Sequence, residues 1–262
     1  MVGAILLAII VAAAVFADQI SPYPPNQQNL RNRLQPPSAE HMLGTDHFGR
    51  DLLSRIIHGG RVSLQVGFVS VAIALAIGGL MGLLSGFYGG RIDSAISAVV
   101  DVLLALPAFL LALAIVAALG PSLINVMIAV GVATVPLFAR ITRSAVLTVR
   151  EMDYVTAAEA VGARDGGIMF KHVLPNALGP IIVQVTLSLA AAILAAAGLS
   201  FLGLGAQPPT AEWGSMLASA RQYIRDAHWT VTFPGIAIVI TVLAFNLVGD
   251  GLRDALDPRR RD

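Results

Sequence analysis

The chain has 262 residues, of which 56% are hydrophobic and only 13% are charged, and its mean hydropathy is +0.77. Soluble domains carry charges on about a quarter of their residues, so this composition indicates a membrane protein with several spans. The formal net charge of +1 does not suggest a nucleic-acid partner, and the absence of cysteine excludes disulfides and thiolate metal sites.

Six apolar stretches are candidates for transmembrane helices, because a hydrocarbon core of about 30 Å needs roughly 20 helical residues. The predicted fold class is therefore all-α, a polytopic membrane protein with six transmembrane helices. Pro107 is expected to kink the third span. The first stretch has the length of a secretory signal, but no basic residue precedes it, which favours a retained helix. The spans are expected at residues 2–16, 63–86, 94–119, 122–139, 180–202 and 231–248.

The sides of the membrane follow from the Arg and Lys residues, of which ten of 17 fall on one side and seven on the other. By the positive-inside rule the side with ten is cytoplasmic, and both termini lie there. The predicted organisation is a first transmembrane helix (1–17), an external periplasmic segment (18–62), a transmembrane core (63–250) with a cytoplasmic loop (140–176) and an external loop (203–230), and a cytoplasmic tail (251–262).

The loop at 140–176 has the pattern of two short helices. Tyr154, Ala158 and Val161 recur at helical spacing, which predicts one narrow apolar face. Gly162 is expected to end the first helix in a left-handed conformation.

A second short helix is expected after Gly162, with Asp165 as its cap and Pro175 at its end. Ala157, Ala158 and Gly162 have almost no side-chain bulk, so they allow a groove of another protein to approach the backbone closely, in a helix-in-groove contact. An amphipathic helix that lies on lipid headgroups is the alternative.

These residues resemble the cytoplasmic EAA loop of permease subunits in ATP-binding-cassette (ABC) importers, through Thr156-Ala157-Ala158, Gly162 and Leu174-Pro175. More narrowly, the chain resembles the second permease subunit of the dipeptide, oligopeptide and nickel importers. The resemblance includes the runs Leu-Gly-Thr-Asp and Leu-Ser-Phe-Leu-Gly-Leu-Gly. It extends over four stretches in the order of the family, at residues 43–55, 154–176, 199–214 and 245–258.

The resemblance implies a permease of the type I ABC importer fold in a bacterial cytoplasmic (inner) membrane. Its implied partners are a homologous second permease, two ABC ATPase subunits and an external solute-binding protein. Such a chain is a non-catalytic transport subunit that binds no cofactor itself, since ATP and magnesium belong to the ATPase subunits. Consistent with this, the only lysine is Lys171, and no Gly-Lys-Ser/Thr phosphate loop is present. The residues implied to couple to the ATPase are Tyr154, Thr156, Ala157, Ala158, Glu159, Gly162, Ala163, Arg164, Asp165, Leu174 and Pro175.

The implied function is import of peptides, or of a related small solute such as a nickel chelate, by ATPase-driven alternating access. A proton-coupled secondary transporter is the alternative, but such a protein favours several acids within the membrane and an inverted repeat. Only Asp101 is expected at membrane depth, about 12 Å into the third span. It is expected to line the transport path, to pair across the permease interface, or to reach the inner headgroups. Gln184 and Asn246 are candidates for interhelical hydrogen bonds or for path lining.

Charged and aromatic residues recur in the two external segments. Asp46, Arg50, Asp51 and Arg55 have the spacing of helical ion pairs, which predicts an exposed helix. The family resemblance instead implies a structural entry segment beneath the binding protein. An interfacial aromatic belt is expected from Trp213, Tyr223 and Trp229. No metal site is predicted, since the spacing of the histidines does not form a set of ligands (His41, His47, His58 and His228).

Overall fold

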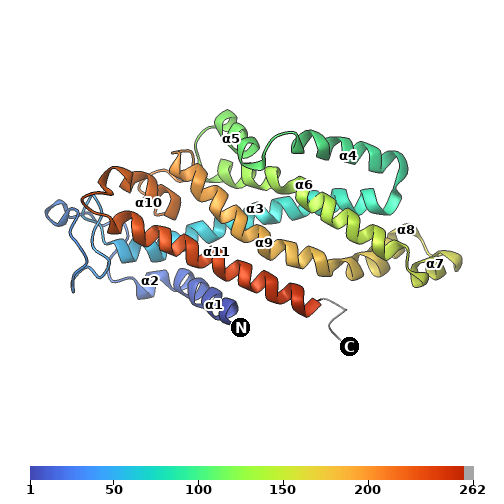
Figure 1. The fold of residues 1–262 in the computed structure, drawn as a ribbon, viewed down its shortest axis with the longest axis horizontal. Helices are drawn as coiled ribbons and strands as arrows, with labels where there is room; N and C mark the ends of the chain where they lie inside the picture. The colour runs from blue at the N-terminus through green and yellow to red at the C-terminus, as the bar shows by residue number, and fades with distance from the viewer. Residues whose placement is uncertain (257–262) are drawn as a thin grey trace.

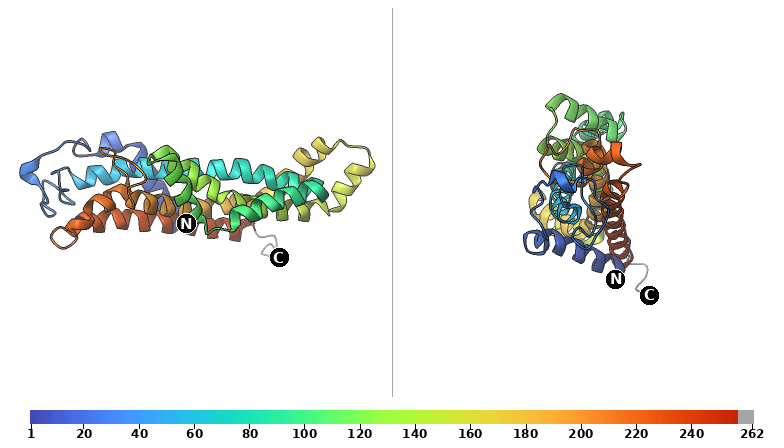
Figure 2. Two further views of the ribbon diagram at one scale, coloured as in Figure 1. Left: turned by 90° about the horizontal axis from the view of Figure 1, so that it is seen from above. Right: turned by 90° about the vertical axis from the view of Figure 1, so that its left-hand side faces the viewer.

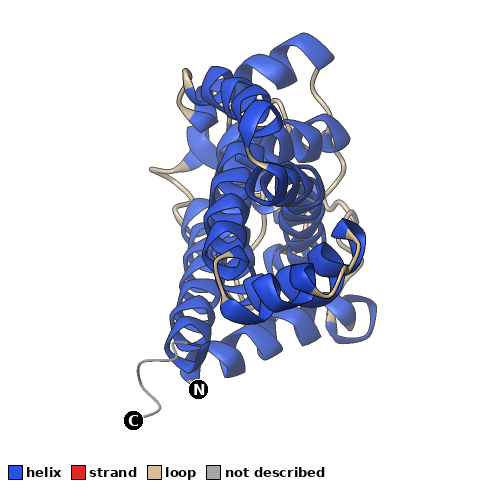
Figure 3. Ribbon diagram, turned by 90° about the vertical axis from the view of Figure 1, so that its right-hand side faces the viewer, coloured by secondary structure: helices blue, strands red, loops and turns tan. Residues whose placement is uncertain are grey.

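The computed structural model describes residues 1–256, and residues 257–262 of the predicted tail lie outside the described residues. Within the described range the chain consists of helices and connecting loops without a β-strand, which confirms the all-α prediction (Figures 1 and 3). Long helices form an elongated bundle (Figure 1), with these bounds: α3 (Leu52–Tyr88), α6 (Leu123–Arg150), α9 (Leu174–Phe201) and α11 (Trp229–Leu256). These four, with α9 taken together with the helical residues that precede it, are long and apolar enough to cross a membrane.

The third predicted span, at 94–119, is two helices rather than one. α4 (Gly90–Leu104) and α5 (Ala108–Leu119) are bent by 83° at the break between them. Pro107 lies in this break and precedes the first residue of α5. A proline disfavours helical geometry at the residue before it and begins a helix easily, so the expected kink becomes a full interruption.

The remaining predicted spans differ from the structure mainly in length. α1 (Val2–Val15) has 14 residues, about 21 Å of helix, and lies beside α11. α6 continues beyond the predicted end at 139 as far as Arg150, so it carries Arg140 and Arg143, which were expected in a loop. The six predicted spans thus correspond to four long helices, one bent pair and one short apolar helix.

Glycines on α3 allow its backbone to lie directly against α6. A Cβ atom added at Gly78, Gly82 or Gly86 would lie 2.4, 2.4 and 2.9 Å, respectively, from a carbonyl oxygen of α6. Small residues at a helix interface let two helices approach closely within a membrane, where hydrophobic burial against lipid gives little driving force. The contact between α3 and α6 therefore depends on the absence of side chains at these three positions.

The two ends of the bundle carry different structures (Figures 1 and 2). One end holds the segment that follows α1, with the short α2 (Ala17–Ile20), and α10 (Trp213–Ala220). The opposite end holds α7 (Asp153–Ala160) and α8 (Asp165–Gly167). Two 3-10 turns lie at Leu30–Asn32 and Arg221–Tyr223, and a π-helical stretch at Ile168–Val173 precedes α9.

The four charged residues expected on an exposed helix are instead buried, three in the turn that leads into α3 and Arg55 in the first turn of α3. Asp46, Arg50, Asp51 and Arg55 are each no more than 7% exposed. Asp46 Oδ2 lies 2.6 Å from Arg50 Nε and 3.6 Å from Arg55 Nε, and Asp51 accepts the backbone N–H of Ser54 to cap α3. Buried charges are tolerated because they are paired and hydrogen-bonded. The predicted exposed helix is therefore wrong, and this turn is an internal structural element.

The predicted interfacial belt is also wrong for its two tryptophans, which are buried. Trp213 Nε1 donates to the carbonyl oxygen of Ile56 at 2.9 Å, and Trp229 Nε1 donates to that of Thr45 at 3.3 Å.

Glu212, which precedes α10, is also buried and accepts the backbone N–H groups of Gly214 and Ser215. Burial raises the pKa of Glu212, and these hydrogen bonds oppose that shift.

Candidate functional sites

The first candidate site is the hairpin segment, which we define as residues 153–173. It includes α7, the loop around Gly162, α8 and a six-residue π-helical stretch, Ile168–Val173, that leads directly into α9. It lies at one end of the bundle, beside the ends of α3 and α6 (Figure 1). The prediction of two short helices is confirmed by α7 and α8. However, the second helix does not end before α9, because it continues through the π-helical stretch into α9.

An apolar cluster holds the hairpin segment to the bundle. Val155 is fully buried, whereas Tyr154 is 43% and Val161 84% exposed. The predicted apolar face was therefore wrong in two of its three members, because the side of α7 that packs inward is the one with Val155 and Ala158. The cluster consists of Leu83, Phe87, Val146, Val149, Val155, Ile168, Met169, Val173 and Ala177.

Gly162 ends α7 in the predicted left-handed conformation, with φ +78°. The N–H of Gly162 donates to Glu159 O, and the N–H of Ala163 donates to Ala158 O. This pair of bonds is a Schellman motif, which satisfies the last carbonyl groups of a helix. A Cβ atom added at Gly162 would have no heavy atom within 4 Å, so its surroundings within this chain are open.

The second half of the hairpin segment departs from the prediction at two residues. Arg164, not Asp165, holds the N-cap position of α8, and no side chain forms a cap hydrogen bond there. Pro175 does not end the helix but lies in the first turn of α9. The π-helical stretch precedes it, with the N–H of Leu174 donating to Met169 O, and this change of hydrogen-bond register lets the helix continue past the proline.

The residues predicted to couple to a partner lie mostly on the surface. Ala158 and Leu174 are partly buried and pack against the apolar cluster. Across the hairpin, Tyr154 Oη donates to His172 O at 3.5 Å. The others are exposed: Tyr154, Thr156, Ala157, Glu159, Gly162, Ala163, Arg164, Asp165 and Pro175.

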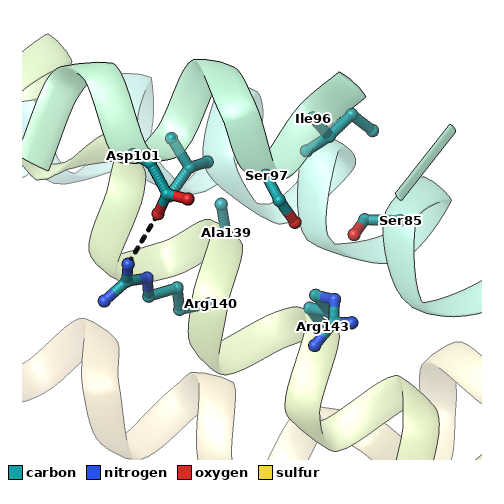
Figure 4. Close-up of a pocket in the computed structure, with 8 residues that line it drawn as sticks. Ser85, Ile96, Ser97, Asp101, Ala139, Arg140 and Arg143 are labelled. Atoms are coloured by element: carbon teal, nitrogen blue, oxygen red, sulfur yellow. Dashed lines mark hydrogen bonds and ion pairs between the residues drawn. The ribbon is translucent and has the colours of Figure 1, made fainter. Parts of the chain in front are cut away.

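The second candidate site is a cavity of about 380 Å³ between α3, α4 and α6, which we call the ion-pair pocket (Figure 4). Arg143 on α6 pairs with Asp93 on α4 through two bonds, of 2.7 and 2.6 Å. Arg140 Nη2 donates to Asp101 Oδ1 at 2.8 Å. The pocket is lined by Ser85, Ile96, Ser97, Val100, Asp101, Ala139, Arg140 and Arg143.

Asp101 is thus paired with Arg140 of its own chain, a pairing that was not predicted from the sequence. Asp93 and Asp101 are eight residues apart, a spacing that places both on neighbouring faces of α4. Arg140 and Arg143, three residues apart, share one face of α6. The pairing was missed because both arginines were assigned to a loop instead of a helix.

The other two polar candidates have different surroundings. Gln184 Nε2 donates to Ser188 Oγ at 2.9 Å, one turn further along the same helix. This bond lies within one helix, whereas an interhelical bond was predicted. Asn246 lies on α11 and is partly buried. Neither residue lines the ion-pair pocket.

Comparison with known proteins identifies the family. Residues 78–262 match the family described as the binding-protein-dependent transport system inner membrane component, and residues 1–37 match the N-terminal transmembrane domain of oligopeptide transport permease C. The dipeptide transport system permease protein DppC of Alkalihalophilus pseudofirmus is 53% identical over 260 residues, covering 99% of this chain and 86% of that protein. The probable D,D-dipeptide transport system permease protein DdpC of Escherichia coli is 46% identical, covering 98% of this chain and 86% of that protein.

A solved structure agrees with this relationship at the level of the fold. The inward-facing MetNI methionine ABC transporter contains a chain that is similar with a TM-score of 0.63 and 21% identity, covering 79% of this chain and 98% of that chain. Together these findings define a multi-pass membrane permease subunit with the fold of ABC importers. The chain belongs to the family of inner membrane components of binding-protein-dependent transport systems.

Proposed function

We propose that this chain is one of two permease subunits in an ABC importer of short peptides. The solute is suggested by the names of its relatives, which include permeases for dipeptides and D,D-dipeptides. A third relative, from Pectobacterium atrosepticum, is a glutathione transport system permease protein and is 45% identical over 96% of this chain. Glutathione is a tripeptide, so the three solutes share the chemistry of a short peptide with charged ends.

The hairpin segment is the proposed contact with the ATPase subunits, which hold ATP and magnesium. The observation that carries this proposal is its construction: the inner face is fixed by buried Val155, while the outer surface exposes Val161 and small residues around Gly162. A rigid element with a small-residue surface suits a helix-in-groove contact. The hairpin segment ends in the π-helical stretch, which continues into α9 without a loop. A movement of the segment is therefore passed on to α9.

The proposed sidedness follows from this contact. With the hairpin segment in the cytoplasm, α10 and the segment after α1 face the periplasm, where an external binding protein delivers the solute. α1 and α11 lie side by side, and the first residues of α1 and the last residues of α11 are directed toward the hairpin end (Figure 1). This agrees with termini in the cytoplasm, as the distribution of arginines suggests.

Reconstitution tests this function. The chain is purified with its second permease and ATPase subunits, placed in proteoliposomes, and supplied with binding protein, labelled dipeptide and ATP. We expect uptake that requires ATP and all of these components, because the sequence contains no Gly-Lys-Ser/Thr phosphate loop. The chain alone should transport nothing. Peptide uptake by the chain alone, driven by a proton gradient, would contradict the proposal.

A further inference from the structure

The two ion pairs of the ion-pair pocket are built differently. Asp93 and Arg143 form a bidentate pair, and the hydroxyl groups of Ser85 and Ser97 also donate to Asp93 Oδ1. The side chain of Asp93 is 22% exposed and that of Arg143 is 39% exposed. Bidentate geometry and additional donors make this pair a firm connection between α4 and α6.

Asp101 and Arg140 form a much more open pair on the rim of the same pocket (Figure 4). Their side chains are 65% and 61% exposed, and among residues 1–256 a single hydrogen bond joins them. One carboxylate oxygen and most of the guanidinium donors therefore remain available. Since the neighbouring pair already connects α4 to α6, this second pair is not needed for that purpose.

The position of this open pair requires water or another polar group beside it. Arg140 lies ten residues before the end of α6 at Arg150, about 15 Å along the helix. α6 has 28 residues, about 42 Å, and is longer than a hydrocarbon core of about 30 Å, so Arg140 lies toward one end of the part of α6 that crosses the membrane. Charged side chains there avoid lipid and face a protein interface, a water-filled cavity or the headgroups. The cavity of about 380 Å³ beside the pair falls within the usual range for small-ligand pockets, about 300–1,000 Å³.

We propose that the ion-pair pocket binds a short peptide in its zwitterionic form during transport, with the ammonium group at Asp101 and the carboxylate at Arg140. Identification of the solute as a peptide rests on the proposed function. Each end of the peptide meets a group of opposite charge, and Asp101 and Arg140 exchange their bond to each other for bonds to the peptide. No charge is left unpaired at any stage, so the solute enters the membrane without the full cost of an isolated buried charge.

Thiol labelling tests whether water and solute reach the pocket. The chain has no cysteine, so Ser97→Cys introduces a single thiol into the lining of the pocket. Val99→Cys is the matched control, because it lies two residues further along α4, about 200° around the helix, and is outside the pocket lining. The assembled transporter in proteoliposomes is treated with a charged methanethiosulfonate reagent, and modification of this chain is measured by mass spectrometry.

We expect Ser97→Cys to be modified and Val99→Cys to remain unmodified. A dipeptide with free ends should slow the modification by 1 + [peptide]/Kd, about ten-fold at about nine times Kd, whereas an N-acetylated, C-amidated dipeptide should not. In an Asp101→Asn/Arg140→Gln background, which removes both charges together, modification should continue and protection should be lost. Ile96→Cys, also in the lining, serves as a second probe.

Two outcomes would overturn the inference. Absence of modification at both Ser97→Cys and Ile96→Cys in a transporter that takes up peptide would mean that the second permease fills the pocket. Modification without protection by the free dipeptide would mean that water, but not peptide, occupies it. Both differ from failure of the proposed function itself, in which the unmodified transporter shows no ATP-dependent peptide uptake.

Discussion

The close contact between α3 and α6 predicts a strong difference between two glycines only three residues apart. A Cβ atom at Gly82 would lie 2.4 Å from Ala139 O and 2.7 Å from Thr142 Cβ, whereas one at Gly79 would meet only Leu75 Cδ1, at 3.5 Å. Ordinary contact begins near 3.4 Å, so Gly82→Ala must separate the helices by about 1.0 Å, the difference between 3.4 and 2.4 Å. A gap of that size removes a quarter to a half of the attraction at each affected atom pair.

The expected cost of this overpacking is about 1–3 kcal/mol. Both substitutions gain about 1 kcal/mol in helix propensity, and this gain cancels when the two variants are compared. Gly82→Ala should therefore be about 1–3 kcal/mol less stable than Gly79→Ala, which should equal or exceed the wild type. The measurement is reversible unfolding of the purified full chain in mixed detergent micelles. Equal stability of the two variants would refute the proposed packing of α3 against α6.

Three further predictions concern the hairpin segment, the ion-pair pocket and Glu212. Val155→Ala removes two buried carbons and should destabilise the hairpin segment by about 1.6 kcal/mol. The measurement is hydrogen exchange of the backbone amides of α7, which should become faster. Thr156→Ala, at an exposed position, should leave this exchange unchanged. Arg143→Met leaves the Asp93 carboxylate without its ion-pair partner and should lower the melting temperature of the transporter. Adding Asp93→Asn to this variant should recover most of the loss. No recovery would argue against the pairing of Asp93 with Arg143. The pKa of Glu212 in the folded state is raised above its ordinary value of 4.5, so the folded state binds the proton more tightly than the unfolded state does. The contribution of Glu212 to stability is therefore greatest below pH 4.5, and it falls as pH rises through the folded pKa. Glu212→Gln should show a smaller loss of thermal stability over that interval, and an unchanged pH dependence would exclude Glu212 as its source.

The sequence predicted the parts of the fold that depend on local chemistry. Long apolar runs specify helices by themselves, so α3, α6, α9 and α11 were all expected near their observed positions. The left-handed stop at Gly162 was also predictable, because glycine is the residue that adopts this conformation without strain. The all-α class follows from these local signals, whereas the family resemblance rests on the motifs at residues 43–55, 154–176, 199–214 and 245–258.

Features that depend on tertiary packing were predicted less well. Asp46 and Arg50 have helical spacing, but they lie in a turn that contacts Trp229, more than 180 residues away, and local spacing does not reveal this contact. The inward side of α7 could not be assigned from α7 alone, because Val155 and Tyr154 are both apolar enough to be buried. Only the positions of α3 and α6 select Val155.

A substitution at Gly162 tests the proposed coupling between the hairpin segment and the ATPase subunits. Gly162→Asp places a charged side chain where this chain leaves open space, and Asp tolerates the left-handed conformation better than most residues. Gly203→Asp is the matched control, because Gly203 ends α9 at the opposite end of the bundle with the same pair of hydrogen bonds and equally open surroundings. The quantities compared are ATPase subunit retained on purification and peptide imported per ATP hydrolysed. We predict that both fall in Gly162→Asp while the variant remains in the membrane, and that Gly203→Asp retains its ATPase subunits. Wild-type values of both quantities in Gly162→Asp would rule out the proposed coupling.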